Sequence, residues 1–169
     1  MKKIFTVLFL LMVLTACSSN STNKDFNSDT ANLETAKKDT NSEEKTEHDY
    51  QFTGESEHWE AVYSYEGTEL WGENGEQTTH SSQDSYELVL KYKGSLKELS
   101  SMKNLEYTYE TTTSSGTKTE AYKEPPSEKV FTIRGGSENG AIIGEGEIIK
   151  VNVKWDASEE SFELHNKAN

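Results

Sequence analysis

The chain is poor in cysteine and in basic residues, and each shortage excludes a class of protein. Cys17 is the only cysteine among 169 residues, so the chain has no internal disulfide. The formal net charge is -13 at pH 7, and Arg134 is the only arginine. Nucleic-acid binding needs Lys and Arg to displace the counterions of the phosphates. The composition therefore argues against a nucleic-acid partner.

The sequence also lacks a hydrophobic run long enough to span a bilayer. The apolar stretch from Ile4 to Leu14 is shorter than the roughly 20 residues of a transmembrane helix. It follows Lys2 and Lys3 and precedes Leu14-Thr15-Ala16-Cys17, which is the layout of a secretory signal peptide.

The tetrapeptide ending in Cys17 resembles the lipobox of bacterial lipoproteins. In those proteins the cysteine thiol is acylated, for example with palmitate, and the preceding peptide is removed. The resemblance implies a lipoprotein signal peptide over residues 1–16 and lipid attachment at Cys17. We therefore expect a lipid anchor that holds the chain on the extracytoplasmic face of the cell membrane.

Apolar residues are scarce again in the polar segment that follows. Residues 18–49 consist mainly of Ser, Thr, Asn, Asp, Glu and Lys, a composition that cannot form a core. We expect residues 17–49 to be the lipidated cysteine and a disordered tether. The acidic residues from Glu43 to Asp49 lack the spacing of a calcium loop or a zinc motif, so no metal or cofactor is expected there.

From Tyr50 onward the apolar residues alternate with a period of two, as in half-buried strands. The residues expected on buried faces are Trp59, Ala61, Tyr63, Tyr65, Tyr86, Leu88, Leu90, Tyr92, Ile149, Val151, Val153 and Trp155. Turn residues recur every 8 to 12 positions, and the one helical segment expected is a short connector at residues 95–102. We predict one all-β domain over residues 50–169: an antiparallel, immunoglobulin-like β-sandwich of 7–8 strands. A small β-barrel is the alternative.

Several segments of the expected domain are similar to a known group of proteins. They are Gly54-Glu55-Ser56 followed by Trp59, the segments 88–94 and 105–111, and Val151-Asn152-Val153-Lys154-Trp155 followed by Glu159-Glu160. Together they resemble small lipoproteins and secreted proteins of Gram-positive bacteria, a group with no assigned activity. The resemblance implies an extracytoplasmic location and a single domain, and it carries no catalytic residue to this chain.

No catalytic signature stands out in the sequence. The chain has no Gly-x-Ser-x-Gly elbow, and its one cysteine is assigned to the lipid. The histidines at positions 48, 58, 80 and 165 do not have zinc-ligand spacing. We therefore expect a protein that is not an enzyme, with no metal and no cofactor.

The segment from Gly67 to Gln83 is the one expected loop with the character of a binding site. Its candidate contact residues are Trp71, Glu73, Asn74 and Glu76. An aromatic side chain in a polar loop can stack on a sugar or anchor a protein partner. The interpretation we favour is a hairpin at Asn74-Gly75 whose Trp71 folds back to cap the sandwich. A third reading is a divalent cation bound by the glutamates at 69, 73 and 76.

These observations favour a non-catalytic accessory or interaction domain, anchored to the membrane through Cys17 and contacting an envelope protein. The alternative function is a ligand-binding module for a cell-wall glycan or a divalent cation, which would use the Trp71 loop.

Overall fold

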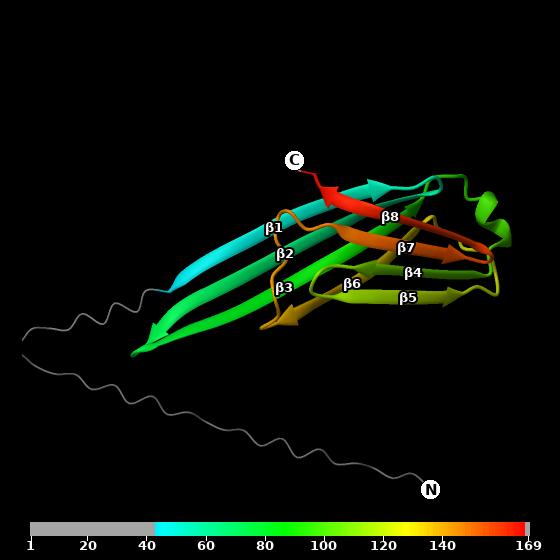
Figure 1. Ribbon diagram of the computed structural model, residues 1–169. Coiled ribbons are helices and arrows are strands. Elements are labelled where there is room, and N and C mark those ends of the chain that lie inside the picture. The colour runs from blue at the N-terminus through cyan, green and yellow to red at the C-terminus, as the bar shows by residue number, and fades with distance from the viewer. Residues whose placement is uncertain (1–42, 168–169) are drawn as a thin grey trace, which may run out of the picture. The chain divides into compact units, whose positions relative to one another are not determined.

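The computed structural model describes residues 43–167, most of which lie in eight antiparallel strands (Figure 1). The strands are β1 (Glu44–Glu55), β2 (Trp59–Asn74), β3 (Gln77–Tyr92), β4 (Asn104–Glu110), β5 (Ser115–Ala121), β6 (Val130–Glu138), β7 (Ile149–Trp155) and β8 (Ser158–Asn166). One short 3-10 helix, η1 (Glu98–Ser101), lies in the connection where a helical turn was predicted. The all-β, antiparallel prediction is confirmed.

The strands form one sheet in the order β5-β4-β7-β8-β1-β2-β3-β6, which folds into two four-stranded halves. The halves are joined where β1 pairs with β8, at Phe52 with Asn166 and at Thr53 with His165. At the open seam between β5 and β6, the Tyr107 hydroxyl and the Lys118 ammonium both donate to the Thr132 carbonyl, at 3.1 and 3.2 Å. The sheet is thus nearly closed, in keeping with a sandwich or a small barrel.

The strand order differs from the immunoglobulin pattern at the second and third strands. In an immunoglobulin domain these two strands lie in different sheets, whereas β2 and β3 here pair along their whole lengths. The reason is the turn that joins them. Gly75 has a φ of 67° at the first of two central positions, a place that favours glycine in tight hairpins. The predicted hairpin at Asn74-Gly75 is confirmed.

The core is built from the predicted alternating faces and is rich in aromatic rings. Its fully buried side chains include Phe52, Trp59, Tyr63, Leu88, Leu90, Leu105, Tyr107, Tyr109, Ile149, Val151, Val153 and Leu164. Trp155, which was expected to be buried, is only half-buried because it is the last residue of β7. Its ring packs against that of Trp59 in a T-shaped arrangement, with ring centroids 5.5 Å apart.

The folded region begins earlier than the sequence predicted. Residues 44–49, assigned to the tether, form the first half of β1 and pair with Glu66–Trp71 of β2. The physical reason is that backbone hydrogen bonds hold these residues, so a polar composition does not prevent the strand. Residues 1–16, Cys17 and the rest of the expected tether to residue 42 lie outside the described region. Between residues 43 and 167, no helix is both long and apolar enough to cross a membrane.

Candidate functional site

The first three strands run on past the other strands of the sheet (Figure 1). We call this part the projecting ribbon: residues 44–50 of β1, 66–74 of β2 and 77–83 of β3. Side chains two apart on a strand share a face, so the face that carries buried Tyr65 continues through Gly67, Glu69 and Trp71. The register places His48 and His80 on the same face. This inner face of the ribbon is the candidate site.

Glu69 links all three strands of the ribbon. One oxygen of its carboxylate lies 3.0 Å from His48 Nε2 on β1, and the other lies 3.1 Å from His80 Nε2 on β3. The hydrogen bond with His48, and then the one with His80, hold the pKa of Glu69 below its usual value of 4.5. His48 Nδ1 in turn lies 3.1 Å from the Tyr50 hydroxyl. The result is a fixed polar network across the ribbon.

Trp71 lies in β2 rather than in a loop, which corrects the sequence prediction. It pairs with His80 in the β2–β3 register, and the two ring centroids are 4.1 Å apart. The side chain is 44% exposed, so it does not cap the sandwich as we had expected. Trp71 cannot cover the core because it is the third residue after Tyr65 on the same face of β2, and the strand carries it away from the core. The exposed indole therefore remains available for contact.

The other three predicted contact residues lie at the end of the ribbon. Glu73 follows Trp71 on the same face, while Asn74 and Glu76 flank Gly75 at the turn, and all are exposed. The glutamates 69, 73 and 76 do not converge on one point. Within residues 43–167, the one group of three acidic or histidine side chains with ligand atoms within 4.8 Å of one another is Glu57, His58 and Glu160.

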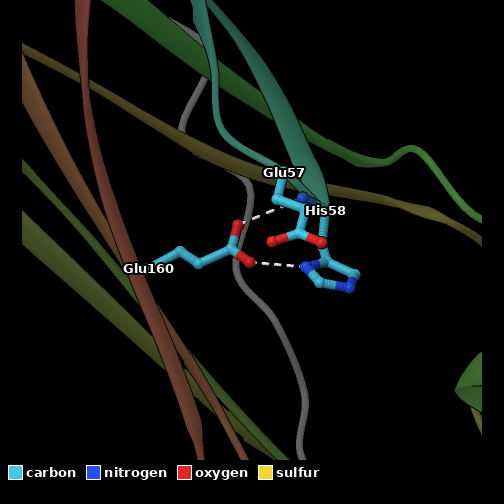
Figure 2. A group of neighbouring side chains, drawn as sticks. All are labelled: Glu57, His58 and Glu160. Atoms are coloured by element: carbon cyan, nitrogen blue, oxygen red, sulfur yellow. Dashed lines mark hydrogen bonds and ion pairs between the residues drawn. The ribbon is translucent and has the colours of Figure 1, made fainter.

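That second cluster lies at the opposite end of β1, where the turn of residues 56–58 leads into β2 and meets Glu160 of β8 (Figure 2). His58 Nδ1 lies 2.5 Å from one oxygen of Glu160, and the His58 backbone N–H donates to the other at 3.1 Å. Burial raises the pKa of Glu160. Hydrogen bonds from Ser56 and His58 outweigh that effect, so the pKa of Glu160 lies below its usual value.

Several of the segments noted in the sequence meet at this cluster. The Gly54-Glu55-Ser56 segment and Trp59 border the turn that Glu160 of β8 holds, and Trp155 of β7 packs on Trp59. A methyl group on Gly54 would lie 2.1 Å from the Glu163 carbonyl oxygen, so β1 and β8 approach closely only because this residue is glycine. These segments therefore have a structural role at the junction of the two halves.

A hydroxyl-lined cavity of about 250 Å³ lies where the ribbon meets the core. Tyr63, Tyr86 and Tyr109 pack against one another beside it, with ring centroids 5.2–5.4 Å apart. Burial raises the pKa of Tyr63 and Tyr109, and it raises the pKa of Tyr65 to about 12. The sequence analysis missed this cluster, because its rings come from three strands whose register the sequence does not reveal.

Comparison with protein-family models, with curated proteins and with solved structures found no match to this chain.

Proposed function

We propose that this protein is a lipid-anchored, extracytoplasmic interaction protein without catalytic activity, and that the inner face of the projecting ribbon is its contact surface. The observation that carries the proposal is Trp71, which is 44% exposed on a strand yet packed against His80. Tryptophan is one of the residue types enriched among the side chains that dominate binding energies.

The support of Trp71 by its neighbours favours a contact role. His80 is held by Glu69, which also bonds His48, so the platform under the indole spans three strands. A side chain that is already ordered loses less conformational entropy on binding than a mobile one. The ribbon thus presents an ordered, exposed aromatic side chain that is surrounded by polar side chains.

The charge of the ribbon favours a partner with basic side chains. Its acidic residues are Glu44, Glu47, Asp49, Glu66, Glu69 and Glu73, and Glu76 lies in its turn, whereas Lys45 is its one lysine and it has no arginine. A surface of one sign speeds association with the opposite sign and repels surfaces of like sign. An envelope protein with a basic patch is therefore the partner class that we propose.

Membrane attachment rests on the sequence features at residues 1–17. In this proposal the acylated Cys17 holds the domain at the outer face of the cell membrane, and the polar segment after it connects lipid and fold. Two acyl chains are needed for stable anchoring, because a single chain binds only marginally.

The test is partner capture by chemical cross-linking in cells that carry the wild-type protein, Trp71→Ala or Leu70→Ala. Leu70 is a matched control, since it is 41% exposed and is the adjacent residue on the opposite face of β2. We expect Trp71→Ala to lose the cross-linked partner and Leu70→Ala to retain it. Equal capture of the partner by both variants would show that the inner face of the ribbon is not the contact surface.

A cell-wall glycan is the second candidate ligand. The adjacent rings of Trp71 and His80 lie beside the Glu69 carboxylate, and sugars bind by stacking on rings and bonding to polar groups. Titration of purified glycan fragments against the wild-type protein and Trp71→Ala distinguishes this candidate from a protein partner. Saturable binding by the wild-type protein alone would favour the glycan.

A further inference from the structure

We propose that Glu57, His58 and Glu160 form a binding site for a divalent transition-metal ion, with Zn²⁺ as the ion that best fits the donor set. The ligand atoms of the three side chains lie within 4.8 Å of one another. The site lies at the opposite end of β1 from the projecting ribbon, and the inference does not depend on the ribbon's proposed role.

The donor set matches the preferences of zinc. Zn²⁺ binds imidazole nitrogen and carboxylate oxygen at about 2.0–2.2 Å, and three protein ligands with one water make a common tetrahedral set. Two carboxylates with a neutral imidazole balance the charge of the ion. Calcium and magnesium prefer oxygen ligands alone, so the imidazole argues against them.

The ligand atoms are close to the positions that a metal requires. In a tetrahedral site, bond lengths of this kind place the nitrogen and oxygen ligands about 3.4 Å apart. His58 Nδ1 and the nearer Glu160 oxygen are now 2.5 Å apart. Binding of the ion at these bond lengths requires the carboxylate to withdraw by roughly 0.9 Å.

His58 is held in place before any ion binds. Its backbone N–H bonds to Glu160, and its ring packs against Tyr92 and Trp155, with centroids 6.3 and 5.8 Å away. Figure 2 shows the carboxylate of Glu57 extending from the same turn toward the other two groups. Glu57 itself makes no hydrogen bond or ion pair within residues 43–167, so its carboxylate is available to a metal.

Metal binding requires the Nδ1 atom of His58 to carry a lone pair in place of a hydrogen. In a neutral imidazole the hydrogen then lies on Nε2, and Nδ1 gives its lone pair to the ion without release of a proton. Metal affinity at imidazole and carboxylate ligands falls as pH falls, because protons compete for the same atoms. Zinc binding is therefore expected to weaken as the pH is lowered.

The His48–Glu69–His80 network in the ribbon provides a control within the same chain. It contains the same residue types, but each imidazole bonds a different oxygen of the one carboxylate. The two histidines approach Glu69 from β1 and β3, on opposite sides of β2. Substitution of His80 removes a surface histidine and leaves the proposed site intact.

The experiment is calorimetric titration with ZnCl2 of the full-length chain in detergent. Every sample carries Cys17→Ser, so that no thiol competes for the metal. The variants are His58→Ala, Glu57→Gln and, as the control, His80→Ala. Thermal unfolding of each variant is measured first. Should His58→Ala fail to fold, Glu57→Gln carries the test, because Glu57 has no bond in the fold to lose.

We expect one zinc per chain in the chain that carries Cys17→Ser alone, the parent chain, and in His80→Ala. In both His58→Ala and Glu57→Gln we expect the zinc affinity to fall by at least about 10- to 100-fold. Loss of a hydrogen bond that supports a metal ligand typically costs that much affinity, and loss of the ligand itself should cost no less. A parent chain that binds no zinc would overturn the proposal. So would binding that His80→Ala abolishes while Glu57→Gln leaves it unchanged, because that result would place the metal in the ribbon.

Discussion

Trp71 and His80 face each other across the β2–β3 hairpin with ring centroids 4.1 Å apart, while the indole remains 44% exposed. Trp59, twelve residues earlier on the same face of β2, is fully buried. One strand thus carries one tryptophan that stabilises the fold and one that is open to contact, and the two respond differently to substitution.

Trp59→Ala should cost about 3–5 kcal/mol in the free energy of unfolding, as is usual for a buried aromatic residue, whereas Trp71→Ala should cost far less. Trp59→Phe should fall between them, because the indole N–H of Trp59 has no hydrogen-bond partner within residues 43–167 to lose. Chemical denaturation measures all three. Equal losses for Trp59→Ala and Trp71→Ala would contradict the assignment of Trp71 to an exposed surface.

Gly54→Ala should destabilise the domain by roughly 1–3 kcal/mol, the usual cost of forcing an extra group into packed structure. The added methyl would lie 2.1 Å from the Glu163 backbone oxygen, so β1 and β8 must separate. Gly144→Ala is the control, because nothing lies within 4 Å of its added methyl. Thermal melting of the two variants should differ by several degrees, and equal melting points would exclude the close approach of β1 and β8.

A chain that starts at Tyr50 should be less stable than one that starts at Glu43, because residues 44–49 pair with β2 and His48 bonds Glu69. The loss of about 1 kcal/mol or more corresponds to a fall of roughly 3 °C or more in the melting temperature of a domain of this size. Differential scanning calorimetry compares the two chains. Identical melting temperatures would show that residues 44–49 do not stabilise the domain and belong to the tether.

Stability should fall in acid because of Glu69 and Glu160. The pKa of each lies below its usual value of 4.5 in the folded chain. At a pH between the pKa in the folded chain and the pKa of 4.5 in the unfolded chain, the unfolded chain binds more protons. The stabilisation by each carboxylate is therefore complete above about pH 4.5 and is lost as the pH falls through the pKa in the folded chain. Urea denaturation between pH 3 and 6 should show that the free energy of unfolding falls less with decreasing pH in Glu69→Gln than in the wild type. An equal fall in the two proteins would contradict the Glu69 network.

Stability should also fall in alkali, for the opposite reason. The pKa of Tyr65 rises to about 12 from a usual value of 10.0, and the pKa of Tyr63 rises as well. Above pH 10 the unfolded chain loses protons that the folded chain keeps, so stability decreases as the pH rises. Phenolate absorbance of these tyrosines should therefore appear together with unfolding, which circular dichroism records. Their ionisation in a still folded chain would show that they are not buried.

The core strands could be predicted because each one carries its own signal. Val151 and Val153 alternate with polar residues, and the Asn74-Gly75 turn is readable from two adjacent positions. The polar residues at the start of β1 and at the end of β2 carry no such signal, which is why the sequence places residues 44–49 in the tether and Trp71 in a loop.

The side-chain clusters depend on contacts that are distant in the sequence. His58 and Glu160 are 102 positions apart, and His48 and Glu69 are 21 apart. Neither pair has a local pattern, because register between strands brings them together. The sequence identified Trp71, Glu73, Asn74 and Glu76 as candidates, but it could not identify His80 as the neighbour that orders the indole.

The pairing of Glu44 with Trp71 has a mechanical consequence for an anchored protein. Glu44 is the first residue of β1. If the chain is anchored as proposed, a force from the lipid anchor is applied to the domain at Glu44, next to the proposed contact residue Trp71. Tension between the membrane and a partner on Trp71 then acts across the ends of two adjacent strands. It would open the β1–β2 ladder one pair at a time from that end, and Phe52 and Trp59 would be reached last. The ribbon would yield under tension before the core does.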